Sequence, residues 1–196
     1  MQDILMEINN LSYRYEDGTL ALDQVSLQIR RHERLAIMGS NGSGKSTLFL
    51  NLNGVCRPTG GQILYEGRPV DYSRKGLLEL RRQVGIVFQD PDNQLFCASV
   101  AGEISFGLYN LGLDEEDRRR VDAVCQKLSI DPFRDKPTHF LSGGQKKRVS
   151  IADILVMRPS LLILDEPFSA LDPKHAQMID EILSQLAREG ITVVIA

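Results

Sequence analysis

The segment from Gly39 to Ser46 constrains this chain more than any other part of the sequence. It reads Gly-Ser-Asn-Gly-Ser-Gly-Lys-Ser and matches the pattern G-x-x-x-x-G-K-[ST]. An apolar run at 35–38, typical of a buried parallel strand, precedes the segment, and a helical pattern at 46–52 follows it. Glycines permit backbone conformations that a Cβ forbids, so that successive N–H groups and the helix N-terminus can face an anion. The sequence therefore predicts an α/β fold that binds a nucleoside triphosphate at this loop.

The chemistry of the loop assigns separate roles to its polar side chains. The Lys45 ammonium is expected to contact the β- and γ-phosphates of ATP, and the Ser46 hydroxyl is expected to ligate Mg²⁺. The alternative is a glycine-rich turn that happens to precede a helix. The candidate nucleotide-binding residues of this loop are Gly39, Ser40, Asn41, Gly42, Ser43, Gly44, Lys45, Ser46 and Thr47.

Two carboxylates follow an apolar strand pattern at 161–164, at Asp165 and Glu166. In an open α/β sheet, ligands bind beyond the carboxyl ends of the strands. We therefore expect Asp165 to hold Mg²⁺ and Glu166 to polarise the attacking water as a general base. The alternative is an acidic residue that only begins a turn.

A second anion-binding helix start is predicted at 141–145, which reads Leu-Ser-Gly-Gly-Gln. Ser142 is a good N-cap for a helix running to about Met157, and Gly143 and Gly144 leave its N-terminus bare of side chains. An ordinary serine-capped helix would explain the cap, but not both glycines followed by Gln145.

The remaining patterns place these motifs in an α/β core with a helical insertion. Alternation at 4–8 and 25–29 predicts two half-buried antiparallel strands, which form an N-terminal β-subdomain. A mostly parallel sheet and a helical block complete the fold. The expected strands are 62–65, 84–88, 161–164 and 191–195, the expected helices 99–111, 114–128 and 173–188. We expect one domain, with a nucleotide-binding core over 1–91 and 142–196 and a helical subdomain over 92–141.

Composition excludes several classes of protein. No apolar run approaches the roughly 18 residues of a membrane helix. The first residues, Met-Gln-Asp, carry neither a basic region nor an apolar segment, so we do not expect a secreted protein. A net charge of -3 does not support a nucleic-acid partner. Three cysteines without zinc-ligand spacing fit a reducing cytoplasm. Any role at a membrane is therefore expected to come through a partner.

The order of these motifs resembles that of the ABC ATPase family over 11–196. The resemblance implies a head-to-tail dimer in which 142–145 caps ATP held by the other subunit. It further implies that Tyr15 stacks on adenine and that Gln89 reaches Mg²⁺ and the attacking water. Asp172, in the loop 169–172, would sense the partner's site. Alternatively, Tyr15 is a core aromatic and Asp172 only caps the helix that begins at Pro173.

A finer resemblance lies in 88–96 and 105–107, which are similar to ATPase subunits of energy-coupling-factor importers for cobalt and nickel. It implies ATP hydrolysis coupled to transport, transmembrane partner subunits, a homodimer or heterodimer of ATPase subunits, and a place at the cytoplasmic face of the membrane. Three alternatives stay open: another ABC transporter, an ABC protein acting on DNA or ribosomes, and a regulatory nucleotide-binding module.

The sequence departs from the family at its end. The family places a histidine after the strand expected at 191–195, but no histidine follows His175. We therefore expect a truncated form that binds ATP and hydrolyses it slowly. Elsewhere, 114–120 and 146–148 are expected on exposed helix surfaces, the alternative for 146–148 being contact with nucleotide or a partner. The histidines at 32, 139 and 175 are isolated in the sequence and are expected to form no metal-ligand pair.

Overall fold

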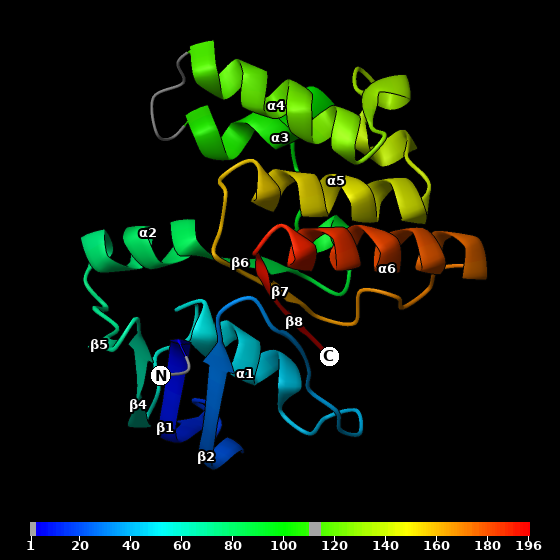
Figure 1. Ribbon diagram of the computed structural model, residues 1–196. Coiled ribbons are helices and arrows are strands. Elements are labelled where there is room, and N and C mark those ends of the chain that lie inside the picture. Colours follow the sequence, from blue (N-terminus) through cyan, green and yellow to red (C-terminus); the bar gives the residue numbers. More distant parts are fainter. Residues whose placement is uncertain (1–2, 110–114) are drawn as a thin grey trace. The chain divides into compact units, whose positions relative to one another are not determined.

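The computed structural model describes residues 3–109 and 115–196 (Figure 1). The chain divides into two compact units. The sheet unit comprises the residues up to Ile86 together with Ser160–Asp165 and Leu186–Ala196. The helical unit comprises the described residues of Val87–Pro159 and Glu166–Gln185.

An antiparallel sheet forms the N-terminal part of the sheet unit, in the strand order β2-β1-β4-β5. Its strands are β1 (Ile4–Arg14), β2 (Leu20–Arg30), β4 (Gly60–Tyr65) and β5 (Arg68–Pro69). Ile8 pairs with Leu27, which confirms the antiparallel pairing predicted from 4–8 and 25–29. Leu5, Met6 and Ile8 are buried, so β1 supplies one wall of the core.

A second, parallel sheet has the strand order β3-β8-β7-β6. Its strands are β3 (Arg34–Ala36), β8 (Thr192–Ile195), β7 (Leu161–Leu164) and β6 (Val84–Val87). All four residues of β7 are buried, as expected for a strand with a neighbour on each side.

The prediction of a buried strand at 35–38 is wrong in length and in burial. β3 ends at Ala36, Leu35 is half-buried, and Met38 is 92% exposed. The physical reason is that β3 lies at the edge of its sheet, where β8 is its one partner among the described strands, so a neighbouring strand covers it on one side.

Two helices belong to the sheet unit. Helix α1 (Lys45–Leu52) follows the phosphate loop as predicted and buries Leu48, Phe49 and Leu52. Helix α2 (Arg74–Gln83) was not predicted, because its sequence is mostly polar and it buries only Leu80. Ser73 caps this helix by accepting a hydrogen bond from the Gly76 N–H at 3.1 Å.

The helical unit is built from α3 (Val100–Tyr109), α4 (Glu115–Lys127), α5 (Gly143–Leu155) and most of α6 (Pro173–Arg188). Short 3₁₀ turns at Pro91–Asn93, Asp131–Phe133 and Thr138–Phe140 connect them. Helix α3 packs on both α4 and α5. The predicted helices agree over the described residues, whereas the predicted stretch 110–114 lies outside them. The structure groups α5 with the other helices, while the subdomain boundaries at 92 and 141 stay a prediction.

The predicted α/β class, with one antiparallel sheet, one parallel sheet and helices, is confirmed. Within the described residues, no helix combines the length and the apolar character that a membrane span needs.

Candidate functional site

The phosphate loop is shaped so that only glycine fits at its turning points. Gly42 and Gly44 have φ angles of 79° and 91°. A Cβ on Gly44 would lie 2.6 Å from the carbonyl oxygen of Ala21, and one on Gly39 would lie 2.5 Å from the Ser43 Oγ. The positive φ angles of Gly42 and Gly44, together with the close approach of the Ala21 carbonyl to Gly44, therefore explain why the loop needs glycine at these two turns.

The first turn of α1 offers its backbone N–H groups without a side-chain cap. Gly44 occupies the N-cap, makes no side-chain cap bond, and no acidic residue stands in the first turn. The Lys45 Nζ donates to the carbonyl oxygens of Gly39 at 2.8 Å and Ser40 at 3.0 Å. A cationic group and uncapped N–H donors at one loop are the donor set that phosphates require, so the loop fits ATP.

Tyr15 is held against the same helix. Its Oη lies 2.8 Å from the Thr47 Oγ1, and its ring packs edge-on against Tyr13 at 5.0 Å between centroids. Tyr15 is 39% exposed, so it is not the buried core aromatic of the alternative interpretation. Stacking on adenine stays a prediction for this ring.

The carboxylate pair stands where β7 ends. Asp165 is 8% exposed and closes the sheet-unit segment, whereas Glu166 has a φ of 41°. A left-handed conformation is uncommon for glutamate. Glu166 accepts a hydrogen bond of 2.7 Å from the Gln89 Nε2. The fold thus joins two predicted catalytic residues that are 77 positions apart in the sequence.

The predicted metal ligands are oxygen donors of the kind that Mg²⁺ prefers: the Ser46 hydroxyl, the Gln89 amide and the Asp165 carboxylate. Among the described residues, no three His, Cys, Asp or Glu side chains are grouped so as to hold a metal. Because Mg²⁺ at nucleotide sites takes one or two carboxylates and completes its shell with phosphates and water, these residues fit such an ion.

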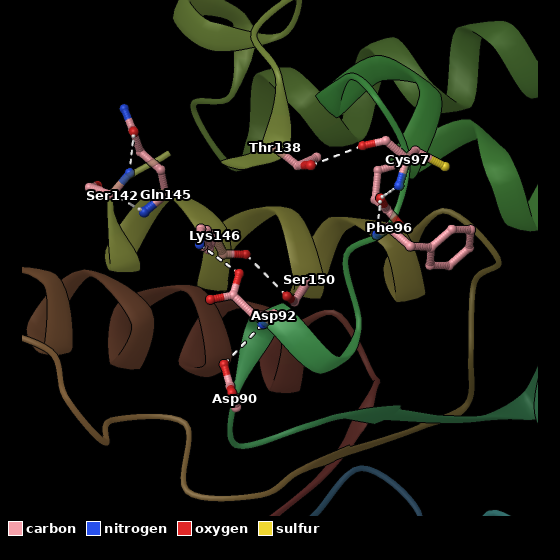
Figure 2. A network of polar contacts seen from close by, with 10 residues as sticks. Asp90, Asp92, Phe96, Cys97, Thr138, Ser142, Gln145, Lys146 and Ser150 are labelled. Carbon is pink, nitrogen blue, oxygen red and sulfur yellow. Dashed lines mark hydrogen bonds and ion pairs between the residues drawn. The ribbon is translucent and has the colours of Figure 1, made fainter. Parts of the chain in front are cut away.

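Helix α5 begins with a complete capping box (Figure 2). The Gln145 N–H donates to the Ser142 Oγ at 3.3 Å, and the Ser142 N–H donates to the Gln145 Oε1 at 2.9 Å. Both side chains are therefore used in starting the helix. Gly143 has open space beside it, with no atom within 4 Å of a Cβ placed there.

Gly144 is glycine for a different reason. A Cβ there would lie 2.4 Å from the Cδ2 of His175. Asp172 fixes this ring through two contacts. Its carboxylate accepts a hydrogen bond from the backbone N–H of His175 at 3.0 Å, and it lies 2.5 Å from the ring Nδ1. Hydrogen bonds from the backbone and then the ring of His175 lower the pKa of Asp172. Asp172 therefore caps the start of α6, as one of the two interpretations predicted, whereas its contact with the His175 ring was not predicted.

The prediction of an exposed surface at 146–148 is wrong as well. Lys147 is 1% exposed and Arg148 is 8% exposed. The Arg148 guanidinium donates to the carbonyls of Leu128 and Ser129 and lies 5.0 Å from the centre of the Phe133 ring. Burial lowers the pKa of Arg148. Sequence periodicity missed this, because α5 is covered on several sides and its basic residues reach backbone carbonyls.

A buried acidic network was also missed. Glu103 is fully buried and accepts from the backbone N–H groups of Phe96 at 2.9 Å and Cys97 at 2.6 Å. The Gln94 Nε2 donates to the Asp153 Oδ2 at 3.2 Å. The signal for this network was the position of Glu103 on the face of α3 that also carries the buried Ile104 and Leu108.

Asp153 is the unusual titrating group of this network. Burial raises its pKa to about 6, the charge of Glu103 adds to that effect, and the hydrogen bond from Gln94 opposes it. Between about pH 4 and pH 6, the folded chain therefore holds a proton that the unfolded chain releases. The contribution of Asp153 to stability consequently falls as the pH rises through this window.

One cavity of the helical unit, of about 270 Å³, is lined by residues from three predicted motifs. Gln89 and Asp90, Gly143, and the loop 169–171 share it with the buried Lys147. The site residues thus fall into two sets. The phosphate loop, Tyr15 and Asp165 lie in the sheet unit, while Gln89, Glu166, the 142–145 motif and Asp172 lie in the helical unit.

Known proteins match this arrangement closely. The profile of the family described as ABC transporter matches residues 22–169. The energy-coupling factor transporter ATP-binding protein EcfA3 of Clostridium perfringens is 52% identical over the whole chain, which spans 70% of that protein. The corresponding EcfA of Methanothermobacter thermautotrophicus is 48% identical over 98% of the chain, which spans 62% of that protein.

Solved structures agree with these sequence matches. The structure of cbiO1 from Clostridium perfringens, part of the ABC transporter complex cbiONQ, has a TM-score of 0.89 at 50% identity and covers 99% of this chain and 78% of its own. The dimeric cassette MJ0796, in a post-hydrolysis state bound to ADP and Pi, has a TM-score of 0.87 at 30% identity and covers 97% of this chain and 87% of its own.

Proposed function

This chain belongs to the ABC transporter family, in the group of energy-coupling factor ATP-binding proteins, and we propose that its ATPase activity drives uptake of cobalt or nickel ions. The catalytic part of this proposal rests on the 2.7 Å hydrogen bond between Gln89 and Glu166. Glu166 follows Asp165 directly in the sequence. A carboxylate and an amide at the end of a buried strand are suited to holding and polarising a water molecule.

Each predicted residue has a role in this proposal. The phosphate loop, with Lys45, binds the phosphates of ATP. Glu166 accepts the proton of the attacking water, and Gln89 orients both this water and the Glu166 carboxylate. Mg²⁺ would be held by Ser46, Asp165 and Gln89, and it would neutralise charge that develops on the phosphates.

A second cassette completes the proposed assembly. The N-terminus of α5, with Ser142 and the open face at Gly143, would contact the nucleotide held by the phosphate loop of the other subunit. Asp172 would contact that subunit through its loop. The dimeric structure of the cassette MJ0796 supports a pair of cassettes by similarity, and the partner is either a second copy or a related ATPase subunit.

The transmembrane partner is proposed to dock beside the turn that follows Gln89. Phe96 is 67% exposed, and its ring packs edge-on against Phe106 at 4.7 Å between centroids. Tyr109, one helical turn beyond Phe106, is also 67% exposed. Such a patch of large apolar side chains favours a protein interface. Docking there would hold the chain at the cytoplasmic face of the membrane.

The proposed substrate rests on the resemblance of 88–96 and 105–107 to importers for cobalt and nickel. Uptake of ⁵⁷Co²⁺ or ⁶³Ni²⁺ into proteoliposomes that contain the chain together with its transmembrane partner subunits tests the substrate. We expect ATP-dependent uptake of one of these ions. Uptake of a vitamin in place of either ion would refute the substrate while leaving the ATPase assignment intact.

Glu166→Gln tests the catalytic role. Because the amide keeps the shape of the side chain but is a far weaker base, we expect unchanged ATP affinity and a loss of turnover of about 10²–10³-fold. Glu79→Gln, at an exposed position of α2, is the matched control and should turn over ATP normally. Normal phosphate release by Glu166→Gln would show that Glu166 is not the base.

A further inference from the structure

Lys147 is a buried cation that the function described above does not use. It lies in the second turn of α5 and is 1% exposed. Its Nζ donates to the carbonyl oxygen of Phe88 at 3.1 Å and to that of Gln89 at 2.8 Å. Removing an ammonium group from water is costly unless it is hydrogen-bonded, so these contacts make its burial possible.

The two carbonyl groups lie on either side of one residue. The Phe88 carbonyl belongs to the peptide plane that precedes the Gln89 Cα, and the Gln89 carbonyl belongs to the plane that follows it. Because one ammonium group binds the carbonyl oxygens of both planar peptide units, it restrains the φ and ψ angles of Gln89. The direction of the Gln89 Cα–Cβ bond is restrained with them, and its Nε2 donates to Glu166 at 2.7 Å.

The neighbouring lysine holds the same segment at its other end. Lys146 forms an ion pair of 2.6 Å with Asp92, and Asp90 accepts from the Asp92 N–H at 3.0 Å (Figure 2). Two successive residues of α5 therefore contact the segment around Gln89. Lys147 binds the backbone at Gln89, and Lys146 binds the Asp92 side chain three residues later.

The same helix also carries the predicted contact for the second nucleotide. Gly143 and Lys147 are four positions apart, so they share one face of α5, and both line the 270 Å³ cavity with Gln89. A displacement of the N-terminal turn of α5 would consequently move the Lys147 ammonium relative to the Gln89 backbone.

We propose that Lys147 is a positioning residue, which aims the Gln89 amide at Glu166 and ties this pair to the N-terminal turn of α5. The inference rests on the proposed ATPase mechanism. It adds a connection within one subunit. In the proposed dimer, α5 contacts the nucleotide bound by the other subunit, whereas Gln89 and Glu166 act on the nucleotide bound by their own subunit.

Kinetics of Lys147→Met test the proposal, since methionine keeps an unbranched apolar stem but has no donor. A misplaced positioning contact costs up to about 100-fold in rate. We expect kcat for ATP to fall about 10- to 100-fold while KM stays within about twofold. Lys147→Gln retains two N–H donors and should recover most of the rate. Lys136→Met, at an exposed position of the same unit, is the matched control with unchanged kcat.

The Gln89→Ala background separates positioning from general damage. If Lys147 acts through Gln89, Lys147→Met or Lys147→Gln should have almost no further effect on the residual turnover of Gln89→Ala. An equal fold-loss in both backgrounds, or an unchanged kcat in Lys147→Met, overturns the proposal. Should the methionine variant not fold, Lys147→Ala, which also lacks a donor, is compared in the same two backgrounds and judged by the same outcomes.

A second measurement does not depend on turnover. The side-chain amide of Gln89 can be assigned in a ¹H–¹⁵N spectrum by its loss in Gln89→Ala. We expect its resonances to move towards the values of a solvated amide in Lys147→Met and to stay in place in Lys136→Met. Resonances unaffected by Lys147→Met would overturn the proposal, whereas a wild-type chain without turnover would overturn the proposed function instead.

Discussion

Gly144→Ala should destabilise the helical unit although alanine is the better helix former. The added Cβ would lie 2.4 Å from the Cδ2 and 2.8 Å from the Cγ of His175, well inside contact distance. The ring cannot turn aside easily, because Asp172 contacts both its Nδ1 and the backbone N–H of His175. Either the ring loses that contact, or α5 shifts away from α6.

The magnitude follows from the packing. Forcing an extra carbon into a filled site costs about 1–3 kcal/mol. Replacing glycine by alanine within a helix contributes about 0.5–1 kcal/mol in the opposite direction. We therefore expect Gly144→Ala to lower the free energy of unfolding by roughly 0.5–2 kcal/mol. Gly143→Ala is the matched control, because no atom lies within 4 Å of its Cβ, and it should be neutral or slightly stabilising.

Urea unfolding followed by far-ultraviolet circular dichroism measures both variants without nucleotide. With a urea dependence of about 1–3 kcal/mol per molar, the midpoint of Gly144→Ala should lie about 0.2–2 M below that of Gly143→Ala. Adding His175→Ala to Gly144→Ala should recover part of the loss, because it removes the obstructing ring. Equal midpoints for Gly143→Ala and Gly144→Ala would refute the packing argument.

Three further predictions concern separate parts of the chain. Lys45→Ala should weaken ATP binding by about one to two decades, because a charge-assisted contact is worth roughly 1.5–3 kcal/mol; unchanged affinity in calorimetric titration would contradict the phosphate-loop assignment. Asp153→Asn should be more stable than the wild type at pH 8 by about 2–3 kcal/mol, and the difference should vanish towards pH 4. The reason is that a carboxyl group with a raised pKa destabilises the folded state once it ionises above about pH 6. Parallel profiles of urea stability from pH 4 to pH 8 for the two proteins would show that Asp153 does not titrate in this way. Asp92→Lys combined with Phe96→Ala should abolish coupled ion uptake and preserve ATP binding, with Leu78→Ala, another exposed apolar position, as the control; uptake that persists would place the docking surface elsewhere.

Local sequence predicted the elements whose chemistry is self-contained. The phosphate loop, the start of α5 at Ser142 and the strand before Asp165 were all recognisable, because glycine conformation, helix capping and apolar runs act within a few residues. The limits of β7 and α6 agree with the prediction to the residue. By contrast, α2 was missed because one buried leucine gives too weak a periodic signal.

Contacts between distant segments could not be predicted in this way. A lysine is most often exposed, so the sequence favoured a solvated surface at 146–148. Only the folded chain brings the Phe88 and Gln89 carbonyls within 3.1 Å of Lys147, and these acceptors make its burial tolerable. The ring of His175 against Gly144 was hidden for the same reason.

The sequence by itself determined the family of reactions, since the residues that bind phosphate and polarise water are recognised by type and order. Tertiary structure decided which of them touch: Gln89 with Glu166, His175 with Asp172 and Gly144, and Lys147 with the backbone of Gln89. The physical reason is that a residue's type fixes its chemistry, whereas its burial and its partners depend on which other segments pack against it.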